Sequence, residues 1–172
     1  MASIMETLME VLEAEEQKYE ALLALSQKKT GIIIANDTEA LVKLTDEEQV
    51  IVDEIAVLDK KRETAMKDVA DVMNKKADSF KLSQLVELLS ARPQEQKRLA
   101  AVTDSLRRIT TNMNRVNDQN RELISSALEM VEFDLNLVRG MKAAPETAQY
   151  TSGGYTAGSR LGTASGKFDA KQ

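Results

Sequence analysis

The side chains of this chain that could carry acid–base or metal chemistry are carboxylates and lysines, because the sequence contains 0 His and 0 Cys. Thiol nucleophiles, disulfides, thiolate metal sites and imidazole catalysis are therefore excluded. Carboxylates gather in two short groups, one at Glu13, Glu15 and Glu16 and one at residues 46–48. On exposed helix faces and without histidine partners, such groups are ordinarily solvated charge. Because the sequence also lacks a glycine-rich phosphate loop, we expect no enzyme, no cofactor and no metal site.

Besides these charged groups, the chain contains many apolar side chains that could bind a partner. Hydrophobic residues make up 42% of the sequence, but aromatic residues make up only 3% and there are 8 methionines. An aliphatic, methionine-rich composition favours helices over sheets. Methionine also supplies deformable apolar surface, and a group of four is expected to serve a groove that accepts another helix: Met9, Met113, Met130 and Met141.

Residues 93–141 are predicted to form one long helix. Pro93 suits a first helical turn, Glu95 lies on the positive end of the helix dipole, and Gly140 after Arg139 predicts the end. Within it, apolar residues alternate at steps of three and four, which is the spacing of a coiled-coil seam: Leu99, Val102, Leu106, Ile109, Met113 and Val116. After Asn120 the apolar positions resume at Ile124, Leu128, Val131, Leu135 and Val138.

The preceding residues are predicted to cover that seam. A first helix over residues 2–35 contains Gly31, which marks a kink or an early end, and a turn with an N-cap follows at residues 36–39. The second helix has its seam over residues 41–72, with a capping box at residues 45–48 as the alternative start. A tight turn makes the two helices antiparallel. A short apolar helix before Pro93 is expected to cap the bundle, with Phe80 packed against it.

Two polar features interrupt the seams. Folding the hairpin at residue 36 or 37 brings Glu15 within about one turn of Arg62, so we predict an ion pair that fixes the register of the two helices. The alternative is that both side chains extend to water. Asparagine is a poor helix former, yet four cluster in the long helix: Asn112, Asn114, Asn117 and Asn120. Either Asn117 or Asn120 is predicted to hydrogen-bond within the bundle.

Beyond Asn120, apolar residues occur on more than one face of the predicted helix, including Leu123, Phe133 and Leu137. Surplus apolar surface at a helix end indicates a groove for a partner. The sequence then changes character, since residues 140–172 hold 6 of the 7 glycines. We therefore predict a helical bundle over residues 1–140 and a flexible tail over residues 141–172.

The predicted tail contains three aromatic residues, Tyr150, Tyr155 and Phe168, for which a pure linker has no use. Spaced aromatic residues in a flexible segment are typical of anchors for a partner. The alternatives are that the tail is merely solvated or that it docks back on its own bundle.

The charge and hydropathy of the sequence indicate which kinds of partner and which cellular location to expect. The net charge is −5, with 14 acidic and 5 basic residues in residues 1–60, while the long helix is locally basic. We interpret the two halves as mutually neutralising faces and expect no nucleic-acid binding. The sequence has neither an 18-residue apolar run nor a secretion signal, so no membrane insertion and a cytoplasmic location are expected.

These features together resemble the FlgN family of flagellar export chaperones. The resemblance covers nearly the whole chain, from the acidic first helix to the ending between Tyr150 and Asp169. It is carried by three stretches: Asp37-x-x-x-Leu41-x-x-Leu44 followed by Glu48, Leu58-x-x-x-Arg62, and Asn117-x-x-Asn120-x-x-Leu123-Ile124.

The resemblance implies an all-helical antiparallel bundle. This agrees with the fold that periodicity and composition predict, an all-α, elongated antiparallel helical bundle or coiled coil with three long helices, one short helix and a flexible C-terminal tail. It also implies a cytoplasmic chaperone that covers the terminal helices of hook–filament junction proteins and delivers them to export gate or ATPase components. The expected partner-binding residues combine the end of the long helix with the tail: Leu123, Ile124, Leu128, Val131, Phe133, Leu135, Val138, Tyr150, Tyr155 and Phe168.

The alternative function is a structural coiled-coil module that forms a homodimer and has no client. Such a dimer would use the seam from Leu99 to Val116 and would tolerate loss of the tail. A chaperone would instead lose its client when the residues after Leu123 are removed. The sequence leaves open whether the free protein is a monomer or a homodimer.

Overall fold

A computed structural model describes residues 3–76 and 80–143, and these residues are helical apart from short connections, which confirms the predicted all-α bundle. The chain divides into two units, Met1–Phe133 and Asp134–Gln172, which we describe separately. The predicted tail positions Tyr150, Tyr155 and Phe168 lie outside the described residues.

The first two helices form the predicted hairpin. Helix α1 (Ile4–Ile34) and helix α2 (Thr38–Val72) are joined by a turn in which the Asp37 side chain accepts a hydrogen bond of 2.9 Å from the Ala40 backbone N–H. Asn36 has a φ of 54°, a left-handed conformation that asparagine tolerates better than most residues. The second helix therefore begins at the earlier of the two predicted starts.

The rest of the described chain forms two α-helices and one 3₁₀ turn. Helix α3 (Leu82–Leu88) and the turn η2 (Leu89–Ala91) lead into helix α4 (Pro93–Ala143), which begins at the predicted proline. The predicted end of this helix at Gly140 is wrong, because α4 continues through Gly140 to Ala143. One helical glycine costs only about 1 kcal/mol, whereas a proline disfavours helical geometry in the residue before it, and Pro145 follows two residues after Ala143.

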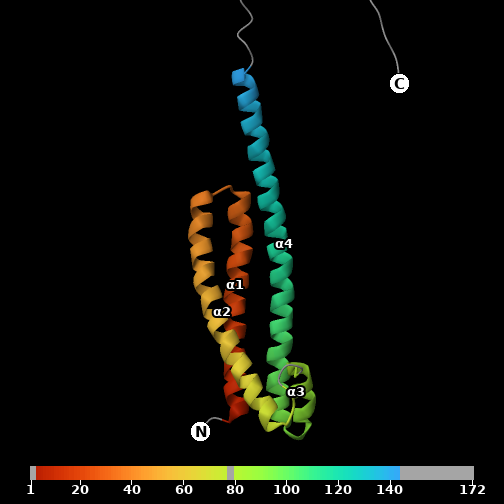
Figure 1. Cartoon of the computed structure of the whole chain (residues 1–172). Helices are drawn as coiled ribbons and strands as arrows, with labels where there is room; N and C mark the ends of the chain where they lie inside the picture. Colours follow the sequence, from red (N-terminus) through yellow and green to blue (C-terminus); the bar gives the residue numbers. More distant parts are fainter. Residues whose placement is uncertain (1–2, 77–79, 144–172) are drawn as a thin grey trace, which may run out of the picture. The chain divides into compact units, whose positions relative to one another are not determined.

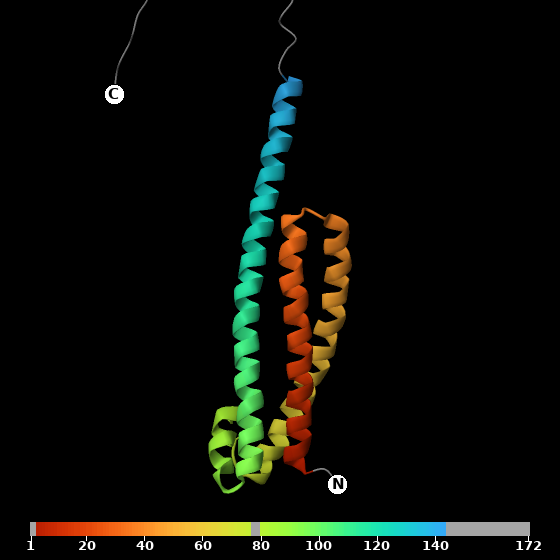
Figure 2. The same ribbon diagram turned by 180° about the vertical axis from the view of Figure 1, so that it is seen from behind.

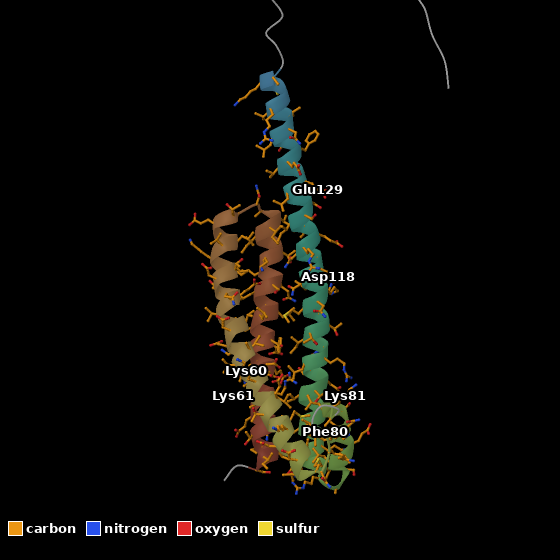
Figure 3. The ribbon with its side chains drawn as sticks, in the orientation of Figure 1. Lys60, Lys61, Phe80, Lys81, Asp118 and Glu129 are labelled. Carbon is orange, nitrogen blue, oxygen red and sulfur yellow. The ribbon has the colours of Figure 1, made fainter. Side chains whose placement is uncertain are left out.

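Within the first unit, the three long helices run up, down and up. Helix α1 lies between α2 and α4 when the molecule is seen from the front and from behind (Figures 1 and 2). A hydrophobic core cluster draws on α1, α2, α3, η2 and α4 and lies at the end of the bundle where α3 packs: Met5, Leu8, Met9, Leu12, Ala65, Val69, Leu85, Leu89, Leu99 and Val102. Phe80, labelled beside α3 in Figure 3, packs against this cluster as predicted.

Candidate partner-binding site

A buried ion pair joins α1 to α2. Glu15 is only 3% exposed, and Arg62 Nε donates a hydrogen bond of 3.1 Å to Glu15 Oε1. The predicted ion pair between these two residues is therefore present. Burial raises the pKa of Glu15, and the positive charge of Arg62 opposes that rise. Arg62 also pairs with Asp59, one turn earlier on α2.

A second polar layer joins all three long helices. Asn120 of α4 is 3% exposed, and its Nδ2 atom donates a hydrogen bond of 2.8 Å to the backbone oxygen of Ser26. The Thr30 hydroxyl donates a bond of 2.6 Å to Asn120 Oδ1. Ser26 Oγ in turn donates to Glu48 Oε1 of α2 at 3.4 Å, and Lys29 pairs with the same carboxylate. Both polar groups of the Asn120 amide are thus satisfied inside the bundle.

The structure distinguishes the two asparagines that the sequence left as alternatives. Asn120 makes the hydrogen bonds within the bundle, whereas Asn117 is exposed and lines a shallow hollow beside Arg121 and Ile124. Both partners of Asn120, the Ser26 backbone oxygen and the Thr30 hydroxyl, belong to α1.

Arg98 joins the start of α4 to α1. Its Nη1 atom donates to Glu6 Oε1 at 2.8 Å, and its Nε atom donates to Glu13 Oε1 at 2.6 Å. The hydrogen bond from Arg98 is the main reason that the pKa of Glu13 is lowered. Sequence spacing does not single out this contact, although Glu6 and Glu13 lie one heptad apart on one face of α1 and so could have indicated a shared cation.

An apolar groove lies beyond the Asn120 layer, at the turn between α1 and α2. It encloses about 200 Å³ and is lined on one side by the end of α1, the turn and the start of α2, including Ile32, Ile33 and Leu41. On the α4 side it is lined by Ile124, Ala127, Leu128 and Val131. Leu128 is 64% exposed, so this wall is available to a partner.

The apolar residues at the end of α4 divide into two stripes. An α-helix turns by about 100° per residue, so the position of each residue around the helix follows from its number. The residues of the groove stripe fall within an arc of about 80°: Ile124, Leu128, Val131, Leu135 and Val138. A second stripe is centred about 130° away and falls within a similar arc: Leu123, Met130, Phe133, Leu137 and Met141.

The predicted partner-binding residues are therefore not all on one face. Phe133 and Leu123 belong to the second stripe, while Leu128 and Val131 line the groove. Phe133 is 67% exposed, and Leu123 is partly buried. In the second unit, Leu135 and Val138 are exposed on the groove stripe, and Leu137 and Met141 are exposed on the second stripe. One docked helix could not cover both stripes, because a core-facing stripe is typically little wider than about 100°.

The methionines do not share one groove. Met9 is buried in the cluster around α3 and Met113 is partly buried, whereas Met130 and Met141 are exposed on the second stripe. The expectation that all four serve a common groove is wrong, because only the two at the end of α4 are available to a partner.

The seam that a structural homodimer would use is already covered within one chain. Four of its residues are buried: Leu99, Val102, Ile109 and Val116. A dimer built on this seam would first have to separate α4 from the hairpin, so the alternative of a coiled-coil module gains no support from it.

The described residues contain no group of three or more acidic side chains placed to hold a metal ion. Within residues 3–76 and 80–143, no helix is both long and apolar enough to cross a bilayer.

The comparisons with known proteins identify the family. The family described as FlgN protein matches the chain over residues 1–158. The chain belongs to the FlgN family. No curated protein and no solved structure gives a match to it.

Membership agrees with the resemblance carried by the sequence motifs and with the helical bundle. FlgN is a chaperone family of flagellar assembly, so the general role of a flagellar export chaperone comes with membership. It is not a known enzyme family. The match extends beyond α4 and includes the sequence positions of Tyr150 and Tyr155.

Proposed function

We propose that this FlgN protein binds an amphipathic helix of an export client in the groove between the α1–α2 turn and α4. The observation that carries the proposal is the exposed wall formed by Ile124, Leu128 and Val131, which faces the end of the hairpin across an open groove. Burying this wall requires a partner with an apolar face at helical spacing.

The groove has the features of helix-in-groove recognition. Its α4 wall has the three- and four-residue spacing with which one helix packs on another, and Ile33 and Leu41 add apolar contacts from the hairpin. Ile124, Leu128 and Val131 are 37%, 64% and 52% exposed, so covering the apolar area that they leave in water contributes roughly 3–5 kcal/mol before the cost of ordering the partner. Binding of that strength is reversible, which suits a chaperone that must release its client.

The proposed clients are the hook–filament junction proteins, through the terminal helices that remain uncovered until assembly. Such a helix cannot bury its apolar face alone, so a chaperone that covers it prevents premature association. In this proposal the protein acts in the cytoplasm and brings its client to the export gate or to the export ATPase components.

The test is a titration of the purified full-length chain with a peptide that spans a terminal helix of a junction protein from the same organism. The variant Leu128→Asp places a charge on the groove wall and is expected to weaken binding by at least about tenfold, equivalent to about 1.4 kcal/mol. Binding is measured by isothermal titration calorimetry.

The matched control is Phe133→Asp, which introduces the same charge about 140° around the same helix. It is expected to change the affinity by less than about twofold. Equal losses in the two variants, or no binding by the unmodified chain to any terminal-helix peptide, would refute the proposed site.

A further inference from the structure

The second stripe is a separate apolar surface that the groove partner leaves uncovered. Met130 and Phe133 are exposed in the first unit, and Leu137 and Met141 are exposed in the second. Ser105, Asn112 and Gln119 lie on the same side of α4 nearer its start, so this side of the helix is polar until about Leu123. The change from polar to apolar side chains indicates a dedicated partner for the last turns of α4.

The chain itself supplies a segment of suitable length and composition. Helix α4 ends at Ala143, and Pro145 follows two residues later, which favours a change of chain direction close to Met141. From Ala143 the helix runs back about 9 Å to Leu137, a distance that an extended chain covers in about three residues. A turn at Pro145 followed by an extended return therefore brings Tyr150 within reach of Leu137.

The segment also has the chemistry for an apolar stripe. Residues 145–158 contain one charged residue, Glu146, and two tyrosines, whereas residues 159–172 contain four charged residues. A tyrosine covers apolar surface with its ring and keeps its hydroxyl in water, at the cost of only two rotatable bonds. The FlgN match includes residues 145–158 and ends there.

We propose that residues 145–158 fold back on the end of α4 and cover the part of the second stripe that lies in the second unit, with Tyr150 packed against Leu137 and Met141. This arrangement rests on the proposed function only in leaving the groove stripe to the client. It assigns the tail aromatics to the chain's own helix, so that the tail supports the last turns of α4 from the side that the client does not use.

The test uses disulfide formation in the full-length chain without a client. Because the sequence contains 0 Cys, two introduced cysteines are the only thiols present. The pair L137C and T151C places one thiol on the second stripe and one beside Tyr150. The control pair L135C and T151C moves the first thiol by two residues, to the groove stripe about 160° away.

Under mild oxidation, the first pair is expected to form an intramolecular disulfide at least about fivefold faster than the control pair. Adding Tyr150→Ser to the first pair should reduce its rate to that of the control. The products are separated on non-reducing gels and verified by mass spectrometry. The measurement does not depend on whether a client binds the groove, so its failure is distinguishable from failure of the proposed function.

Three results would overturn the inference. Equal rates for the two pairs would mean that the tail has no preferred face. A disulfide-linked dimer as the main product of the first pair would assign the second stripe to another copy of the chain. In a repeat with a client peptide present from the start, a rate for the first pair that falls to that of the control pair would assign the stripe to the client.

Discussion

Asn120 occupies a buried position of α4, four residues after Val116, where the heptad spacing ordinarily places an apolar side chain. Its amide donates to the Ser26 backbone and accepts from the Thr30 hydroxyl, and Glu48 of α2 reaches the same layer through Ser26. A buried amide with two specific partners favours one register of the helices, because any shift leaves its polar atoms unpaired.

Replacing Asn120 should therefore cost more than its size suggests. Asn120→Ala removes both amide hydrogen bonds and leaves the Thr30 hydroxyl only its long bond of 3.4 Å to the Ser26 backbone oxygen. We therefore expect the free energy of unfolding to fall by about 1–3 kcal/mol. Asn117→Ala, three residues earlier and exposed, should change it by less than about 0.5 kcal/mol. Urea titration followed by circular dichroism measures both. Similar effects in the two variants would show that the layer has no special role.

The raised pKa of Glu15 predicts that the free energy of unfolding depends on pH. Burial raises its pKa in the folded protein, so the folded state holds the proton more tightly than the unfolded state does. The contribution of this group to stability is therefore largest at low pH and is lost as the pH rises through the raised pKa.

The variant Glu15→Gln mimics the protonated form at every pH. Its stability relative to the unmodified chain should therefore increase as the pH rises above the ordinary glutamate value of 4.5. Urea titrations at a series of pH values between about 4 and 7 give this difference. A difference that stays constant over that range, or that shifts in favour of Glu15, would contradict the assignment of burial as the main cause.

At the residue level, the sequence predicts the partners of polar side chains that lie on the apolar seams. Glu15 and Arg62 each interrupt an apolar seam, so counting heptads across one turn is enough to pair them. Arg98 lies beside its seam at half-exposed surface, where side-chain reach decides the partner, and spacing alone does not select Glu6 and Glu13. The choice between Asn117 and Asn120 likewise needs the relative height of α1 and α4.

At the level of the element, α4 is longer than its sequence signals indicate. The predicted stop at Gly140 relies on the usual role of glycine after a helix, but that role requires a left-handed residue, and Gly140 lies within the helix. A Cβ atom at Gly140 would meet nothing within 4 Å.

Gly140→Ala should therefore extend or stabilise the end of α4. Alanine is favoured over glycine in a helix by up to about 1 kcal/mol, and less near a frayed end. Slower amide hydrogen exchange over residues 136–143, measured by NMR, is the expected result. If Gly140 instead ended the helix, alanine would speed exchange there. Gly31→Ala, at a glycine inside α1 with the same free space, serves as the control for the general effect of the substitution.

The two apolar stripes of α4 are a feature whose placement the sequence pattern does not determine. A step of four residues from Asn120 leads to Ile124 and the groove stripe, while a step of seven from Val116 leads to Leu123 and the second stripe. Both steps fit a helical seam, so the sequence alone does not decide which stripe faces the hairpin. The groove lined by Ile124 and Leu128 becomes visible only when the end of α1 is placed beside them.

At the scale of the whole molecule, the helices and their order follow from periodicity, caps and one proline. The all-α class, the hairpin turn at Asp37 and the start of α4 at Pro93 are all predicted correctly. These features depend on residues that are close together in the chain, so the sequence predicts them directly. The groove depends on two segments far apart in the chain, residues 32–41 and 124–131, and so it could be anticipated only as surplus apolar surface.

The central claim is that a client helix binds beside the α1–α2 turn and against the groove stripe. Hydrogen–deuterium exchange of the full-length chain, with and without a saturating terminal-helix peptide from a junction protein, tests it most directly. We predict that the peptide slows exchange at residues 32–41 and 124–131 together. Protection confined to residues 97–116, or no change at either segment with peptide bound, would contradict the account.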